Sequence, residues 1–244
     1  MNKRTLIVCV AFAISAALTV AASASAVQLT FPTGTKLATG GKLQTTNVGN
    51  FFFKGFKPET SQTCTSMIST GTLTHNGSED ITTEITSLTF RGTATAERCT
   101  LTTGPTMNVT TNYEEGGKKV GVPYCLTSTT GTDKWTMPGG ACGGAPRAIK
   151  FKVDLYSSEP DPETEIFTLL ATCVYEKANL AGTFATDTGL GQDALLTFSE
   201  EGVFKRTELS NILYFQSCPE ETKLIATATM ETDTTSAADP LYIS

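Results

Sequence analysis

Asp187-Thr188-Gly189 is a stretch of this sequence whose residue types could carry out chemistry. In aspartic proteases two Asp-Thr-Gly loops meet, and their two aspartates share one proton so that a water can be activated. This chain holds one copy, and its flanks depart from the protease pattern, because Phe184-Ala185-Thr186 precedes it and Leu190 follows it. Since Asp, Thr and Gly all favour turns, we interpret the stretch as a hairpin turn between strands 179–187 and 193–199.

His75 is the only histidine, so any Ser-His-Asp or Cys-His site would have to use it. It lies beside the turn sequence 76–80, where a histidine is usually solvated. A pair of carboxylates, as in glycosidases, is the other hydrolytic arrangement to consider. The acidic candidates are Glu159, Asp161, Glu163, Glu165, Glu200, Glu201, Glu220 and Glu221. They fall in turns, where carboxylates normally serve solubility, and we assign no catalytic residue.

The acidic stretch 159–165, EPDPETE, holds several oxygen ligands of the kind that calcium prefers. It has neither the EF-hand spacing nor an aspartate-glycine repeat, so a calcium-dependent adhesion module remains an alternative. A zinc site is not expected, because the chain has no Cys-x-x-Cys and a single histidine. We therefore expect no metal and no cofactor.

Six cysteines follow Cys9, and their even number in an exported chain predicts three disulfides. The spacing alone leaves the pairing open. We favour sequential pairs, because consecutive strands usually lie next to each other. The expected disulfides are Cys64–Cys99, Cys125–Cys142 and Cys173–Cys218.

The loop between Cys125 and Cys142 carries Trp135 and Met137, with Tyr124 directly before it. Aromatic side chains dominate the energetics of protein interfaces, so these residues form a candidate contact loop. The alternative is that Trp135, the single tryptophan, belongs to the core.

Residues 1–26 read as a secretory signal peptide. Met-Asn-Lys-Arg is followed by a short apolar run and by the small residues AASASA, with cleavage expected after Ala26. The short signal, rich in alanine and serine, has a bacterial character. The expected product is a secreted, extracellular domain of residues 27–244 with no membrane span.

The composition indicates a strand-rich protein, because threonine is β-branched and is the most frequent residue. The formal net charge is −6, and it becomes more negative once Lys3 and Arg4 leave with the signal. A nucleic-acid partner is not expected, because no basic footprint is present. The same acidity argues against binding to anionic membranes.

The front half predicts a hairpin of residues 63–75 and 81–95, because Asn76-Gly77 is a strong turn signal. Asn76 and Asn108 also begin N-glycosylation sequons, which would matter only in a eukaryotic secretory route.

The back half alternates apolar and polar residues with a period of two. Residues 147–175 predict a long hairpin, in which strands 147–156 and 166–175 are joined by the acidic tip 157–165. The turn 199–202 should return strand 203–209 onto the preceding strand, and 223–232 should be the last strand. These patterns predict an all-β fold of antiparallel, sandwich-like sheets. A candidate boundary between two subdomains lies at the glycine-rich residues 138–146.

Three segments carry a resemblance to a group of proteins: VPYCLTS (122–128), TCVYEKANLAGTF (172–184) and SCPEETKLIATATM (217–230). With the threonine-rich hairpin, they make the chain resemble uncharacterised, secreted, β-rich, cysteine-containing proteins of actinobacteria. That resemblance implies a bacterial extracellular protein without an assigned activity, and it transfers no catalytic residues.

Taken together, we expect a secreted non-enzymatic protein that is structural or that binds an extracellular or cell-surface partner. The alternatives are an extracellular hydrolase, acting as a glycosidase or protease through a carboxylate pair, and the calcium-dependent adhesion module.

Overall fold

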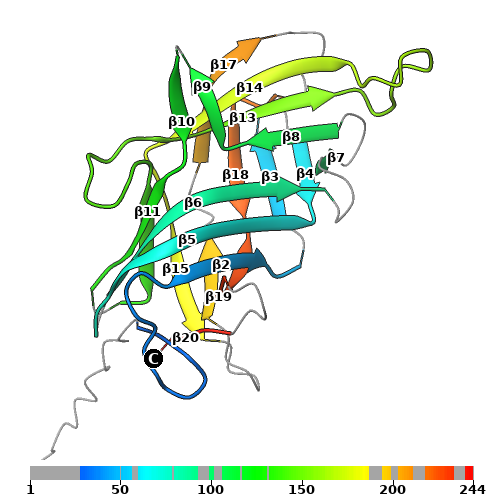
Figure 1. The fold of residues 1–244 in the computed structure, drawn as a ribbon. Helices are drawn as coiled ribbons and strands as arrows, with labels where there is room; N and C mark the ends of the chain where they lie inside the picture. Colours follow the sequence, from blue (N-terminus) through cyan, green and yellow to red (C-terminus); the bar gives the residue numbers. More distant parts are fainter. Residues whose placement is uncertain are drawn as a thin grey trace, which may run out of the picture.

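The computed structural model describes residues 28–49, 51–56, 60–78, 80–92, 99–101, 106–115, 117–130, 132–186, 194–198, 203–210, 218–233 and 240–243. Within these residues every regular element is a β-strand (Figure 1). The strands are β1 (Leu29–Thr30), β2 (Lys42–Asn47), β3 (Phe51–Phe56), β4 (Thr60–Cys64), β5 (Ser66–Asn76), β6 (Ile81–Arg91), β7 (Cys99–Leu101), β8 (Thr106–Thr110), β9 (Asn112–Glu115), β10 (Lys118–Gly121), β11 (Tyr124–Ser128), β12 (Lys134–Pro138), β13 (Ile149–Tyr156), β14 (Leu169–Lys177), β15 (Asn179–Thr186), β16 (Ala194–Phe198), β17 (Val203–Ser210), β18 (Glu221–Ile225), β19 (Thr227–Thr232) and β20 (Tyr242–Ile243).

Two sheets each close into an antiparallel barrel of eight strands. The lower barrel in Figure 1 has the order β11-β12-β15-β16-β19-β2-β5-β6, and the upper barrel has the order β13-β14-β17-β18-β3-β4-β7-β8. The predicted all-β, antiparallel class is therefore confirmed. Each sheet closes on itself instead of facing a second open sheet. Closure gives hydrogen-bonding partners to the strands that would otherwise lie unpaired at the edges of the sheet.

The chain crosses between the barrels after every one or two strands. Single residues make three of the crossings: Thr65 between β4 and β5, Ala178 between β14 and β15, and Ala226 between β18 and β19. The glycine-rich residues 138–146 lie at the crossing from β12 to β13, and strands of both barrels occur on either side of them. The two barrels are therefore interleaved along the sequence and are not divided at that segment.

The predicted last strand, 223–232, is wrong as a single element. It is divided into β18, in the upper barrel, and β19, in the lower barrel. Leu224, Ala226, Ala228 and Met230 are all buried, so the alternation continues unbroken through the crossing. A period of two reports burial on one face and cannot show that the chain has changed barrels.

The expected return of strand 203–209 onto 193–198 is also wrong. In the structure β16 pairs with β15 and β19, whereas β17 pairs with β14 and β18. A short turn signal favours pairing between neighbours in the sequence, but here the two strands belong to different barrels. Residues 199–202 lie outside the described residues.

Three hairpins follow the predictions from the sequence. Strand β5 pairs with β6, β13 with β14, and β15 with β16. Asp187-Thr188-Gly189 lies between the last pair, outside the described residues. Residues 1–26, which are predicted to be a signal peptide, also lie outside them.

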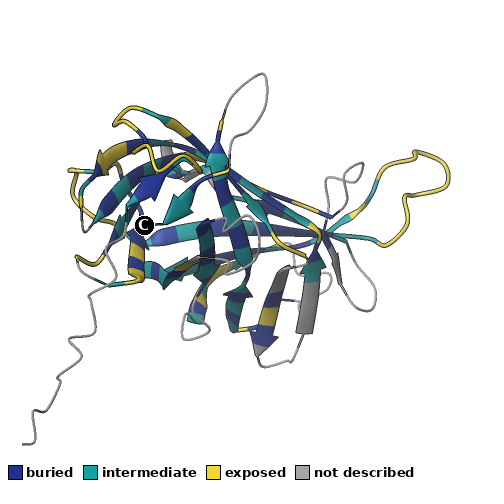
Figure 2. Ribbon diagram, turned by 90° about the horizontal axis from the view of Figure 1, so that it is seen from below, coloured by how far each residue is buried: buried dark blue, intermediate teal, exposed yellow. Residues whose placement is uncertain are grey.

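A cluster of aromatic rings joins the two barrels. Phe151 of β13 lies at its centre, with ring centroids 4.7 Å from Phe204, 5.4 Å from Phe53 and 5.5 Å from Tyr175. Phe53 in turn makes an edge contact at 5.4 Å with Phe90 of the lower barrel. All five side chains are buried, so the barrels share one continuous core. Figure 2 shows the buried positions alternating along the strands of both barrels.

The terminal strap, which we define as residues 28–41, covers the mouth of the lower barrel. Its strand β1 pairs with β20, which brings the two ends of the described chain together. Leu29 of the strap and Leu241, directly before β20, are completely buried. The strap and β20 therefore close one end of the lower barrel.

All three predicted disulfides are present: Cys64–Cys99, Cys125–Cys142 and Cys173–Cys218. The sequential pairing arises because Cys64 and Cys99 lie on the adjacent strands β4 and β7 and because Cys142 lies in the loop that returns over β11. Three disulfides fit an oxidising compartment.

We expect Cys125–Cys142 to be reduced first under mild reductant. Its cysteines are partly exposed, whereas the other four are at most 1% exposed, and exchange needs access to a sulfur atom. The measurement is a time course of thiol alkylation followed by peptide mass mapping. Labelling of Cys64 or Cys173 before Cys125 would contradict this order.

Candidate functional site

The residues of the candidate contact loop are interior residues, so the structure agrees with the alternative that Trp135 belongs to the core. Trp135 is 0% exposed, Tyr124 1% and Met137 4%. Trp135 points into the lower barrel, where it makes an edge contact with Phe198 at 5.1 Å between centroids. A tryptophan flanked by polar residues in sequence can still point inward, because neighbouring residues of a strand face opposite sides of the sheet.

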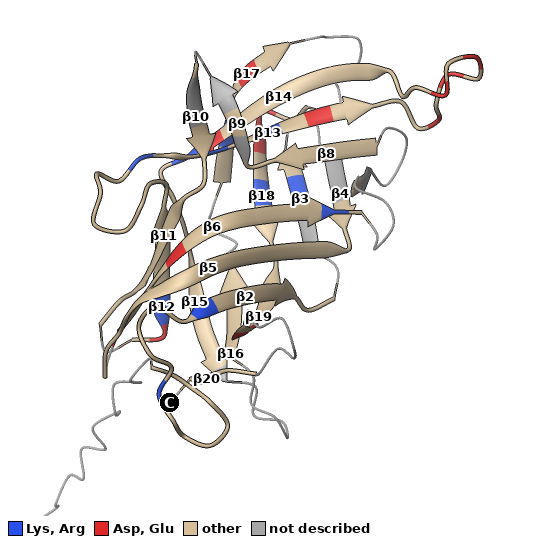
Figure 3. Cartoon of the chain, in the orientation of Figure 1, with Lys and Arg blue, Asp and Glu red and all other residues tan. Residues whose placement is uncertain are grey.

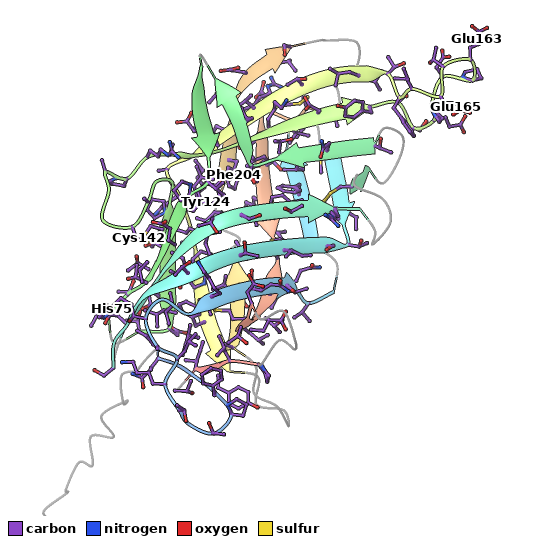
Figure 4. All side chains as sticks on the ribbon, viewed as in Figure 1. His75, Tyr124, Cys142, Glu163, Glu165 and Phe204 are labelled. Carbon is purple, nitrogen blue, oxygen red and sulfur yellow. A yellow bond between two sulfur atoms is a disulfide. The ribbon has the colours of Figure 1, made fainter. Side chains whose placement is uncertain are left out.

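Tyr124 has a structural role at the junction of the barrels. Its hydroxyl donates to the carbonyl of Thr111 at 3.3 Å. Burial raises the pKa of the Tyr124 phenol above its usual range, so the hydroxyl stays protonated as a donor. Figure 4 shows Tyr124 within the fold, whereas His75 lies at its lower left edge.

His75 is at the surface, with 55% of its side chain exposed and its Nε2 3.3 Å from Asp80 Oδ1. Glu220 and Glu221 line a shallow surface hollow with Lys205 and Arg206. Glu200 and Glu201 lie outside the described residues. The structure therefore does not bring His75 together with Glu220 or Glu221.

Two cavities that described residues line inside the fold are small. One of about 20 Å³ lies in the lower barrel, lined in part by Met67, Met137, Met230 and Thr83. The other, of about 10 Å³, lies within the aromatic cluster. A cavity of this size holds about one water molecule, so side chains fill these barrel interiors.

An open groove of about 260 Å³ lies where β6 and β8 meet at the seam of the barrels. Hydroxyl-bearing side chains dominate its lining, and the Thr111 hydroxyl crosses the seam to donate to the Leu88 carbonyl at 2.5 Å. The described residues of this groove include no charged side chain that could select a ligand.

The most prominent external feature is the loop between β13 and β14. This projecting loop, residues 157–168, extends clear of the upper barrel in Figures 1 and 2. It carries four carboxylates and no basic residue, as Figure 3 shows by its concentration of acidic positions. The four are Glu159, Asp161, Glu163 and Glu165. Figure 4 labels Glu163 and Glu165 at its outer end.

Hydrogen bonds order the projecting loop from within. Asp161 Oδ1 accepts from the backbone N–H of Glu163 at 2.9 Å and from that of Thr164 at 3.0 Å. The Thr164 hydroxyl donates to the same oxygen at 3.1 Å. At the base, the Ser157 N–H donates to the Thr168 carbonyl at 2.9 Å, so the loop is closed where it leaves the barrel.

These bonds hold the pKa of Asp161 below its usual range, and the Glu163 N–H is the largest cause. A lowered pKa means that the ordered loop prefers the ionised carboxylate. The stabilisation of the ordered loop is therefore fully present at pH values above the pKa that Asp161 has in the unfolded chain. It is lost as pH falls through the lower pKa that Asp161 has in the folded protein.

Ile166 gives the projecting loop an apolar tip that the sequence pattern did not predict. We expected a strand from residue 166, but β14 begins at Leu169, and Ile166 is 67% exposed. The residue before it, Glu165, has a φ of 57°, in the left-handed region, which turns the backbone out of an extended path. The two prolines within 160–162 were the available signal that the loop is longer than the predicted tip.

The described residues contain no group of three or more His, Cys, Asp or Glu that could hold a metal ion. The Asp161 oxygen that accepts three hydrogen bonds is already engaged. The described residues include no helix with the length and apolar character needed to cross a membrane.

Comparisons with protein-family models, curated proteins and solved structures found no match to the chain.

Proposed function

We propose that this protein acts outside the cell as a non-enzymatic binding protein and that the projecting loop contacts a cationic partner. One observation carries the proposal: the loop is ordered by its own hydrogen bonds, yet it exposes Ile166 among four carboxylates. A loop that is already ordered loses little conformational entropy when it binds, so more of the contact energy appears as affinity.

The charge of the loop identifies the class of partner. Carboxylates attract and orient a basic surface during association, and they repel anionic surfaces. Ile166 adds apolar area at the centre of the contact, where it would be removed from water. The expected partner is a basic protein or peptide surface with an apolar patch.

The expected extracellular location has separate support. The N-terminal sequence resembles a signal peptide, and three disulfides fit an oxidising compartment. A bacterial origin is proposed from the character of the predicted signal and from the sequence resemblance described above.

The hydrolase alternative is less well supported by the loop. A general acid at neutral pH needs a raised pKa, whereas Asp161 has a lowered one. The four carboxylates also lie on the exposed side of the loop instead of facing a cavity.

The test is a charge-matched comparison on a biosensor surface coated with polylysine. The loop variant combines Glu159→Gln, Glu163→Gln and Glu165→Gln. The control variant removes the same number of charges elsewhere, at the exposed residues Asp133, Glu208 and Glu220. We expect the loop variant to lose at least about tenfold more affinity than the control, because the loop concentrates its charge on one ordered contact.

Equal losses in the two variants would mean that net charge, and not the loop, directs binding. A peptide or glycan hydrolysis assay tests the other half of the proposal. Hydrolytic activity that disappears in the loop variant but not in the control would overturn the non-enzymatic assignment.

A further inference from the structure

Asn76, the last residue of β5, holds the terminal strap with its side-chain amide. Nδ2 donates to the carbonyls of Leu29 at 2.9 Å and Leu37 at 2.8 Å, and Oδ1 accepts from the Leu29 N–H at 3.0 Å. Asn76 is only 3% exposed. This one side chain therefore joins the strap to the mouth of the lower barrel at three points.

An amide is the only side-chain group of this size that satisfies all three contacts. Both protons of Nδ2 are donated, and the carbonyl oxygen accepts. A carboxylate in the same place would be acceptor-only, so two of its contacts would become repulsive against the carbonyls of Leu29 and Leu37. It would also place a charge in a buried site, which is costly without a partner.

Asn76 is the only asparagine in the chain that is followed by glycine. An asparagine that is followed by glycine can deamidate spontaneously to aspartate. The backbone nitrogen of Gly77 loses its proton and attacks the side-chain carbonyl carbon of Asn76, a new C–N bond forms, and ammonia leaves. Water then opens the cyclic imide by adding hydroxyl to a carbonyl carbon and a proton to the ring nitrogen, which yields aspartate or isoaspartate.

The closed structure blocks this reaction. The Gly77 N–H donates to the Asp80 carbonyl at 2.7 Å, and the Gln28 amide donates to the Gly77 carbonyl at 2.5 Å. The side-chain carbonyl of Asn76 meanwhile accepts the hydrogen bond from the Leu29 N–H of the strap. The nitrogen and the carbon therefore cannot meet until the strap has moved away.

Glycine at position 77 also has a structural reason. A Cβ there would overlap with the Asp80 carboxylate and lie 2.9 Å from His75 Nε2. The turn thus favours the one residue type that makes the preceding asparagine most reactive, and the docked strap protects that asparagine together with the hydrogen bond from Gly77 to Asp80.

We propose that Asn76–Gly77 is a deamidation site that makes opening of the terminal strap irreversible. While the strap is closed the amide is protected. Once the strap opens, conversion of Asn76 to aspartate removes the two donated hydrogen bonds and prevents the strap from docking again. Opening would leave the apolar side chains of Leu29 and Leu37 without their place in the barrel mouth.

The first experiment compares the rate of deamidation at Asn76 in the folded chain and in the same chain unfolded in urea, by peptide mass mapping. We expect the folded chain to react at least about 100-fold more slowly, because reaction requires local opening. Leu29→Ala should accelerate the folded reaction at least about tenfold by weakening the strap. Leu155→Ala, an equally buried leucine of the upper barrel, is the matched control and should not accelerate it.

The second experiment measures tryptic cleavage after Lys36, within the strap. Asn76→Asp should be cut there at least about tenfold faster than the unchanged chain, whereas Asn108→Asp should not. Fluorescence of buried Trp135 shows whether each variant is folded. If Asn76→Asp does not fold, the deamidated fraction of aged protein, separated by its added negative charge, takes its place. Equal deamidation rates in folded and unfolded chains, or a strap that stays resistant after conversion to aspartate, would overturn the proposal.

Discussion

Gly182→Ala is expected to destabilise the protein by about 3 kcal/mol or more, because the added methyl group has no space. Gly182 of β15 lies under the indole of Trp135 inside the lower barrel. A Cβ at this position would lie 2.5 Å and 2.7 Å from two ring carbons of Trp135, and it would overlap with the backbone carbonyl of Thr197. A backbone atom of a paired strand cannot move without disrupting the ladder between β15 and β16. Urea unfolding monitored by Trp135 fluorescence measures the loss.

The control for Gly182→Ala is Ala185→Val on the same strand, where the side chain is exposed. This change also adds methyl groups, but it should alter stability by no more than about 0.5 kcal/mol. Adding Trp135→Leu to Gly182→Ala should restore only part of the loss, since the overlap with the Thr197 carbonyl remains. Because Trp135 is the single tryptophan, unfolding of this double variant is followed by far-ultraviolet circular dichroism. An unchanged urea midpoint for Gly182→Ala would show that the close approach of Trp135 is not as the structure places it.

Phe151→Ala is expected to cost about 3–5 kcal/mol, the usual range for removing a large buried aromatic side chain. Phe151 is 4% exposed and contacts the rings of Phe53, Tyr175 and Phe204. Since Phe53 also contacts Phe90, the loss should reach the lower barrel. Fluorescence of Trp135, in the lower barrel, should therefore report a lower urea midpoint although Phe151 lies in the upper one.

Ile166→Ala is the matched control for Phe151→Ala, because it also removes a large apolar side chain but from an exposed position. Its effect should stay within about 0.5 kcal/mol. A Trp135 transition that keeps its midpoint in Phe151→Ala, while far-ultraviolet circular dichroism shows an earlier loss of strand, would mean that the barrels unfold independently.

Much of the candidate site was visible in the sequence, but its apolar tip was not. Four carboxylates and two prolines within 159–165 marked an acidic turn between two alternating strands, and the structure has that turn. Ile166 and Phe167 looked like the first residues of the next strand, because an apolar pair beside a strand has the same pattern as a strand. Only the backbone turn at Glu165 and the late start of β14 at Leu169 leave Ile166 in water.

Trp135 is the opposite case, because it is buried. An isolated tryptophan in a disulfide-closed loop had two readings, contact site or core, and local sequence could not choose between them. The choice depends on Gly182, which is 47 positions away in the chain and leaves the space that the indole fills. Similarly, the Asn76 sequon gave no hint that this amide is buried against a strap that begins at residue 28.

The sequence by itself determined the all-β class, the three disulfides and the hairpins of neighbouring strands. These features depend on alternation, turn residues and short separations, which are local properties. The tertiary structure alone decided that the sheets close into two interleaved barrels and that β18 and β19 are separate strands. It also decided that Trp135 is interior and Ile166 exposed. Closure and crossing depend on which distant strands pair, and a period of two is the same whichever barrel a strand joins.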